Sequence, residues 1–401
     1  MSTRISTNMV YNASLNAMLG KQASLNKLQQ QLATGSKLVS AKDNPVAAGT
    51  AVKLDRTVAA LGQFAANADR VENRLGLQEN ALAEAGELMI QVNELTVQAN
   101  NPALSDADLK SIASQLRAIS DQLLAVANST DGSGRFLFGG TSDGTAPFTR
   151  SGNVVTYRGD QNQRQVEVAP DTFVRDALPG SEIFMRIPTG NGTLDAQPGA
   201  GNSGTLIIND YALDPASGSW NGGSYRLHFT SPTAYEIRDS SNTAVQAGTY
   251  SEGDDIQFAG LRVQLQGSPA TGDSLQVGAA SPRDVFTTLD SLASVLERGA
   301  STPAEVAARN NALQSGMRDV ARAREASIDA RASGGSQLAA LDTAASLRQA
   351  DEVTIKATLS GLRDLDYAEA ISRYHLESSA LQAAQTVFTQ MQSMNLFNVL
   401  R

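Results

Sequence analysis

Hydrophobic residues recur at seven-residue spacing through a long stretch of the first third of the chain. One row occupies Leu54, Leu61, Ala68, Leu75, Leu82 and Met89. A companion row follows three residues behind the first, at Phe64, Val71, Ala85, Val92 and Ala99, with Thr57 and Gln78 as polar interruptions. Two apolar rows spaced in this way are typical of a coiled-coil seam, in which helices bury a narrow stripe against each other. The pattern therefore predicts a rod-shaped helical bundle.

Local signals divide this helical region into segments. Residues 100–102, Asn-Asn-Pro, predict the end of the heptad helix, because the residue before a proline is disfavoured in helix. Ser105 and Asp108 then form a capping box with Asp in place of the usual Glu or Gln, which predicts a second, antiparallel helix. In the last third, Pro303 predicts a helix start and Gly334-Gly335 a break. A final long helical stretch is expected from about residue 336 to the C-terminus.

The middle of the chain has a different period. Polar and apolar residues alternate over residues 153–158, 164–168, 224–230, 233–238 and 261–266, which predicts antiparallel strands. The fold class is therefore α+β and multidomain: an elongated antiparallel α-helical rod from both chain ends, with a β-rich domain inserted between them. The Gly/Asn/Pro-rich residues 188–204 are the best candidate for a hinge. We predict five segments: residues 1–44 (terminal helix), 45–187 (helical rod with a small β hairpin region), 188–281 (outer β-rich domain), 282–355 (returning rod helices) and 356–401 (C-terminal assembly helix).

Composition excludes several classes of function. The formal net charge of −9 argues against a nucleic-acid partner, which a basic surface would recognise. The chain has no Cys and two His, so Cys-based nucleophiles and Cys-based metal sites are excluded. No stretch approaches the length of apolar sequence needed to cross a membrane. We therefore expect no enzyme activity, no cofactor, no metal and no membrane partner.

The two chain ends carry the strongest functional signal. Residues 1–42 contain no acidic residue, and residues 378–400 contain no charge at all. Both ends nevertheless hold heptad rows of larger side chains, which we take as the assembly interface: Tyr11, Met18, Leu25, Leu32, Tyr367, Tyr374, Leu381 and Phe388. Polar helices of this kind are marginal in water, so we expect them to be disordered until they are buried against copies of themselves. The alternatives are packing on the bundle of the same chain and, less favoured by the Asn and Gln content, a membrane-surface helix.

Three segments resemble a known family. Residues 32–45, LATGSKLVSAKDNP, and 359–370, LSGLRDLDYAEA, are similar to the N- and C-terminal signatures of flagellins and their junction relatives. Residues 128–140, NSTDGSGRFLFGG, resemble the turn after the second rod helix in the relatives that join hook to filament. The resemblance covers roughly residues 1–150 and 282–401.

The resemblance implies a structural subunit of the bacterial flagellum, located outside the cell at the hook–filament junction. It also implies export through the flagellar type III system and assembly into a ring of copies. The expected partners are a neighbouring hook-associated protein, flagellin, and a cytosolic export chaperone on the C-terminal helix.

Two other functions stay open at this stage. The end signatures also fit flagellin, the filament subunit. The β region offers a third reading as an adhesin or carbohydrate-binding module, because Trp220, Tyr225 and Tyr235 are aromatic residues that stack on sugars when exposed. The simpler interpretation of these three residues is core packing.

Overall fold

The structure of the protein is a computed structural model that describes residues 7–399. It divides into two compact units. The first unit is built from residues up to 66 together with residues from 344 onward, and the second from residues 67–343. Two long helices, α2 (Pro45–Ala99) and α5 (Pro303–Arg363), contribute to both units.

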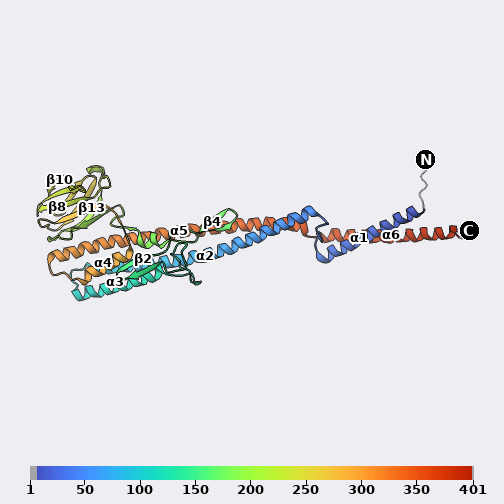
Figure 1. Ribbon diagram of the computed structural model, residues 1–401, viewed down its shortest axis with the longest axis horizontal. Helices are drawn as coiled ribbons and strands as arrows, with labels where there is room; N and C mark the ends of the chain where they lie inside the picture. The colour runs from blue at the N-terminus through green and yellow to red at the C-terminus, as the bar shows by residue number, and fades with distance from the viewer. Residues whose placement is uncertain (1–6, 400–401) are drawn as a thin grey trace. The chain divides into compact units, whose positions relative to one another are not determined.

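The first unit joins the two ends of the chain. It contains α1 (Thr7–Thr34), α6 (Tyr367–Val399), the start of α2 and the end of α5. Helices α1 and α6 lie side by side, although they come from opposite ends of the sequence (Figure 1). The expectation that helices from both chain ends pack together is therefore confirmed.

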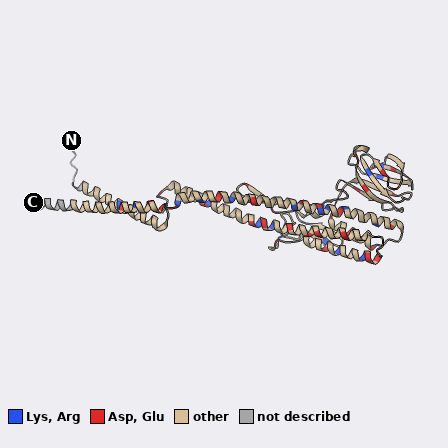
Figure 2. Ribbon diagram, turned by 180° about the vertical axis from the view of Figure 1, so that it is seen from behind, with Lys and Arg blue, Asp and Glu red and all other residues tan. Residues whose placement is uncertain are grey.

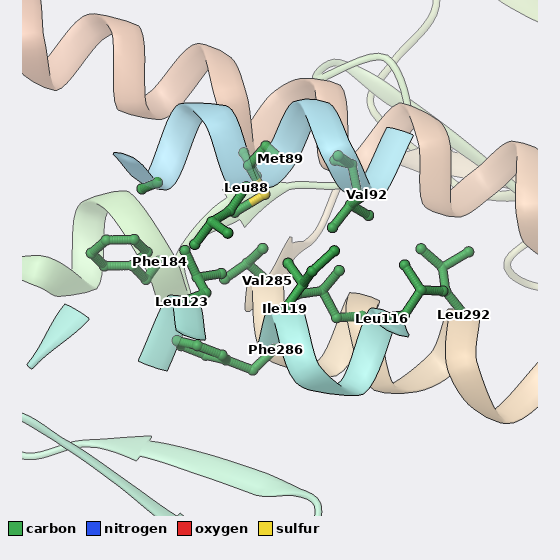
Figure 3. Packing of buried hydrophobic residues seen from close by; sticks show 14 of the residues in the cluster. Leu88, Met89, Val92, Leu116, Ile119, Leu123, Phe184, Val285, Phe286 and Leu292 are labelled. Carbon is green, nitrogen blue, oxygen red and sulfur yellow. The ribbon is translucent and has the colours of Figure 1, made fainter. Parts of the chain in front are cut away.

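The second unit has a helical core. It is formed by α2, α3 (Asp106–Ala127), α4 (Val285–Glu297) and α5. Figure 3 shows apolar side chains from α2, α3 and α4 converging between the ribbons, among them Met89, Leu123 and Phe286. Each buried side chain of this size stabilises the fold by roughly 1.5–3 kcal/mol.

The local signals in the sequence hold in this core. Helix α2 ends at Ala99, α5 begins at Pro303, and α3 begins with the predicted capping box. The Ser105 hydroxyl accepts the Asp108 N–H at 3.3 Å, and Asp108 accepts the Ser105 N–H at 3.0 Å.

Several short elements lie between the helical core and the inserted β-rich residues of the second unit. They are the hairpins β1 (Phe148–Ser151) with β2 (Val154–Tyr157) and β3 (Gln165–Ala169) with β4 (Thr172–Arg175), then the π-helical turn η1 (Ser181–Met185) and the two-residue strands β5 (Ile187–Pro188) and β14 (Pro282–Arg283). Strands β5 and β14 pair antiparallel, Pro282 with Pro188 and Arg283 with Ile187.

The inserted β domain, residues 189–281, lies between those two strands. Its sheets have the orders β10–β9–β8–β13–β6 and β11–β12–β7. The strands are β6 (Leu194–Pro198), β7 (Ile207–Leu213), β8 (Tyr225–Ser231), β9 (Ala234–Asp239), β10 (Ala244–Thr249), β11 (Asp255–Phe258), β12 (Leu261–Gln266) and β13 (Ser274–Ala279), with a 3-10 turn η2 (Pro215–Ser217) after β7. The two sheets enclose a hydrophobic cluster of their own. The α+β fold class and the five predicted strands are confirmed.

The predicted break at Gly334-Gly335 is wrong, because α5 runs through both glycines and ends at Arg363. A glycine inside a helix costs about 1 kcal/mol relative to alanine. Contacts on either side stabilise the helix here: Arg331 pairs with Glu79 of α2 at 2.7 Å, and Gln337 accepts the Arg175 N–H at 3.1 Å. Tertiary packing therefore outweighs the local signal.

The predicted domain boundaries fall at identifiable places. Those at 187/188 and 281/282 lie at the β5–β14 ladder. The boundary at 355/356 lies inside α5. The division into five segments stays a prediction.

Candidate assembly interface

The paired helices α1 and α6 hold most of the predicted interface residues between them. Tyr11 and Phe388 are in ring contact, with centroids 5.0 Å apart. The Gln29 amide donates to the Tyr374 hydroxyl at 3.1 Å, and Lys21 pairs with Glu377 at 2.8 Å. These contacts join the two helices within one chain, and the ring contact joins a predicted residue of α1 to one of α6.

The eight predicted residues differ in burial. Six are half-buried along the pair: Met18, Leu25, Leu32, Tyr374, Leu381 and Phe388. Tyr11 and Tyr367 are 45% and 52% exposed. That these residues form an assembly interface, and that the helices order only on assembly, stays a prediction.

A second set of apolar side chains points away from the pair. The exposed residues are Met9, Val10, Leu15 and Leu19 on α1, and Ile371, Leu376 and Val387 on α6. Over residues 9–34 and 367–390 no large apolar side chain is fully buried, and Ala370 is the buried residue of this region. Figure 2 shows the same helices largely free of charged residues toward the chain ends. The pair therefore presents an apolar, weakly charged surface.

The two family-like terminal signatures meet where these helices join the rest of the first unit. The Lys37 N–H donates to the Arg363 carbonyl at 2.6 Å, and the Leu365 N–H donates to the Gly35 carbonyl at 3.0 Å. Ser36 and Asp364 form the antiparallel bridge between these bonds. The α1–α2 and α5–α6 connections are thus joined to each other by backbone hydrogen bonds. We call this junction, residues 35–37 with residues 363–365, the crossing.

Gly35 is required at this crossing for two reasons. Its φ of +65° lies in the left-handed region, which side chains other than glycine rarely adopt. A Cβ atom at this position would also lie 2.8 Å from the Tyr367 hydroxyl oxygen. The glycine in the first signature and the tyrosine in the second are therefore fitted to each other.

Charged groups hold the same crossing. Asp43 pairs with Lys27 at 2.7 Å and accepts the Ser40 and Val39 N–H groups at 2.8 and 3.1 Å. The bond from Lys27 is the main reason that the pKa of Asp43 lies below its ordinary value, and the backbone bonds add to it. On the neighbouring helices, Arg363 donates to Asp55 with both terminal nitrogens.

The third family-like segment, residues 128–140, is anchored in the second unit by Arg74 of α2. This side chain is 4% exposed. Its nitrogens donate to the Asp176 carbonyl at 3.0 Å, to the Phe136 carbonyl at 2.7 Å and to the Asp131 carboxylate at 3.1 Å. Burial lowers the pKa of Arg74, and the surrounding carboxylates oppose that shift.

Other polar groups complete this cluster. Arg164 makes a two-pronged contact with the Asp176 carboxylate at 2.8 and 2.9 Å, and lies 3.3 Å from Asp143. The Gln78 amide donates to the carbonyls of Leu137 and Asp176 at 3.2 and 3.1 Å. Sequence reasoning missed the cluster. The available signals were an arginine inside the heptad region and Gln78, which was noted only as an interruption.

Metal-binding clusters and membrane-spanning helices were the remaining features to be located among the described residues. Among the side chains that the structure describes, residues 9–390, no group of three or more His, Cys, Asp or Glu residues is placed to hold a metal ion. Among the described helices, none has the length and apolar character to cross a membrane.

The aromatic residues considered for sugar stacking are also accounted for. Tyr225 and Tyr235 are buried in the core of the inserted β domain, and Trp220 packs against it. The core-packing interpretation is confirmed, so this cluster gives no basis for a carbohydrate site.

Comparison with known proteins gives consistent similarities. Residues 5–143 match the bacterial flagellin N-terminal helical region. Over 400 residues the chain is 27% identical to flagellar hook-associated protein 3 of Salmonella typhimurium, covering 99% of this chain and 100% of the relative. It is similar to the crystal structure of Xanthomonas campestris FlgL, at 56% identity and a TM-score of 0.73, covering 77% of this chain and 99% of that one. It is also similar to the crystal structure of flagellar hook-associated protein-3 from Legionella pneumophila, at 25% identity and a TM-score of 0.72. This similarity covers 77% of this chain and 98% of that one.

Proposed function

The chain belongs to the family of flagellar hook-associated protein 3, FlgL, and on this basis we propose that its α1–α6 pair is the surface through which copies assemble. The protein is a non-enzymatic structural component of the extracellular bacterial flagellum at the hook–filament junction.

The exposed apolar surface of the pair is the observation that carries this proposal. Leu19 and Leu376 are 56% and 71% exposed, on helices with few charges to keep them soluble. Several exposed large apolar side chains on one pair of helices are typical of a protein–protein contact. In the proposed arrangement the six half-buried heptad residues hold α1 to α6, and the exposed apolar side chains, together with Tyr11 and Tyr367, meet the neighbouring copy.

The proposed partners follow from the same surface. Copies of this chain form a ring, which contacts a neighbouring hook-associated protein on one side and flagellin on the other. Before export by the flagellar type III system, a cytosolic chaperone covers α6. Residues 378–400 carry no charge, and the exposed apolar side chains of α6 need such a cover because they otherwise promote association in the cytosol.

A location experiment tests the function. An antibody against the inserted β domain is used for immunogold labelling of intact flagella. A single band of gold between hook and filament is expected. Gold along the whole filament would instead identify a filament subunit, and the absence of gold from flagella would overturn the proposal.

A pair of leucine substitutions tests the surface. Leu19→Asp places a charge on the exposed row of α1, and Leu213→Asp places one on an exposed leucine of the inserted β domain, 47% exposed. In a strain lacking its own copy of the gene, we expect Leu19→Asp to abolish filament attachment and release flagellin into the medium. Leu213→Asp should restore swimming. Equal swimming with both variants would contradict the proposed surface.

A further inference from the structure

The inserted β domain joins the helical core through two neighbouring strands. The Thr189 N–H donates to the Ser281 carbonyl at 2.9 Å, and the Ser281 N–H donates to the Thr189 hydroxyl at 3.1 Å. The outgoing and returning chains are therefore bonded to each other, next to the β5–β14 ladder. A hinge expected in residues 188–204 would have to act on this paired connection.

Asn311 of α5 binds the edge of one sheet. Asn311 is buried, with 5% of its surface exposed. The amide oxygen accepts the Ile208 N–H at 2.8 Å, and the amide nitrogen donates to the Leu206 carbonyl at 2.7 Å. Strand β7 is the edge of the sheet β11–β12–β7. One carboxamide thus supplies the donor and the acceptor that a peptide group of a further strand would supply.

Asp319, two turns along α5, binds both connecting chains. It is 3% exposed. One carboxylate oxygen accepts the Gly190 N–H at 2.9 Å, and the other pairs with Arg283 at 2.7 Å. Gly190 has a φ of +64°, and a Cβ there would lie 2.2 Å from the Leu194 carbonyl oxygen. Only glycine therefore fits at the position whose N–H is bonded to Asp319.

Weaker contacts lie between these two points on the same face of α5. The Gln197 amide donates to the Ser315 hydroxyl at 3.1 Å. Arg318 donates to the Asn209 carbonyl at 3.0 Å, and its guanidinium lies 4.9 Å from the centre of the Tyr211 ring. The face therefore contacts the β domain over about two helical turns.

The hydrophobic cores do not extend across this contact. Every buried member of one cluster comes from the helices and short elements of the second unit outside residues 189–281, and every member of the other comes from the inserted β domain. Apolar burial is non-directional, whereas buried hydrogen bonds require defined distances and angles. The orientation of the domain therefore depends on the polar contacts.

We propose that Asn311 and Asp319 are positioning residues that hold the inserted β domain in one orientation on α5. Domains within a chain are expected to move relative to each other unless their interface prevents it. Here two nearly inaccessible side chains fix the β7 edge and both connecting chains, which makes the domain a rigid extension of the helical core. This inference does not depend on the assembly proposal.

Distance measurements between spin labels test the inference. The chain has no cysteine, so Gln115→Cys on α3 and Ala247→Cys on β10 give two unique label sites on exposed residues. In the otherwise unchanged full chain we expect a narrow distance distribution. Asn311→Leu keeps the size of the side chain and removes both bonds, and should broaden the distribution about twofold. Ser315→Ala removes one weaker contact and should leave the width unchanged.

The single tryptophan separates loosening from unfolding. Trp220 packs against the core of the inserted β domain, so its fluorescence reports that this domain is folded. A broad distribution in the parent chain, or a narrow one in Asn311→Leu with native fluorescence, would overturn the inference. Where Asn311→Leu loses that fluorescence, the double variant Asp319→Ala with Arg283→Gln decides, because it removes the acceptor of the Gly190 N–H and leaves no unpaired charge. A narrow distribution in that folded variant would also overturn it.

Discussion

The paired terminal helices and the helical core of the second unit are built from similar heptad sequences but bury their side chains differently. In the core, α2, α3 and α4 enclose large side chains such as Leu116 and Phe286, each about 1% exposed or less. Between α1 and α6 the corresponding side chains are half-buried, and a further apolar row is exposed. A two-helix pair has too little interior to cover both faces. A heptad pattern therefore predicts helix pairing without telling whether the pairing is complete within one chain.

The difference also affects charged groups. Arg74 in the second unit is enclosed by carboxylates and carbonyls, whereas Arg363 in the first unit pairs with Asp55 at side-chain exposures of 40% and 45%. Removing one partner from a buried charge cluster leaves the other groups unpaired, but exposed partners regain water. Matched substitutions in the two units can therefore measure how far their interiors differ.

The largest effect is expected for Arg74→Met. It should lower the free energy of unfolding by about 3–5 kcal/mol, because the carboxylates around it lose their buried partner. Arg363→Met should cost about 1 kcal/mol or less. Urea unfolding followed by circular dichroism measures both variants. Equal losses would show that the two units do not differ in this way.

An intermediate effect is expected at the crossing of the terminal signatures. Gly35→Ala forces a side chain into a left-handed conformation and against the Tyr367 hydroxyl, and should destabilise the crossing by about 1–3 kcal/mol. Gly361→Ala is the matched control. It lies inside α5 with open space around its Cβ position, and should stabilise by about 0.4–1 kcal/mol.

Amide hydrogen exchange distinguishes the two glycine variants. Gly35→Ala should accelerate exchange in residues 24–34 and 365–375 and leave the helical core of the second unit unchanged. Unaltered exchange at the crossing would mean that the backbone bonds between the two connections contribute little.

The smallest effect is expected from pH at Asp43. Its pKa in the folded protein is below the ordinary value of 3.8, so the unfolded state takes up a proton first as the pH falls. The stabilisation from Asp43 is therefore present above pH 3.8 and is lost as the pH falls through the lowered pKa. Asp43→Asn should make helix content less sensitive to acid over this range. Circular dichroism during acid titration compares the parent chain with Asp43→Asn. Coinciding acid profiles would contradict the prediction.

Local chemistry explains which elements could be predicted from sequence. The end of α2 at Ala99 and the cap at Ser105 depend on neighbouring residues, and both are confirmed. Strand β10 was missed because Ala244–Thr249 is exposed on nearly every residue and shows no alternation. The last long helical stretch is interrupted after Arg363, where α5 ends and no proline is present. This end coincides with backbone hydrogen bonds to Gly35 and Lys37, which are distant in the sequence.

The candidate site shows the same limit. The heptad residues at both ends could be selected from spacing, and Tyr11 does contact Phe388. The exposed row with Leu19 and Leu376 could not be separated from them, because only the paired helices show which face is left over. The contacts of Arg74 and Asn311 join segments distant in sequence and were invisible to a local pattern.

The pairing of α1 with α6 also sets an order of events. Gln29 and Tyr374, which are bonded to each other, are 345 residues apart in the sequence. Bringing ends this distant together costs roughly 5 kcal/mol of loop entropy unless the intervening chain has already folded. Because a ribosome makes the chain from its N-terminus, α1 can pair only after α6 has been synthesised. A chain that stops before Tyr367 lacks α6 and therefore cannot form this contact.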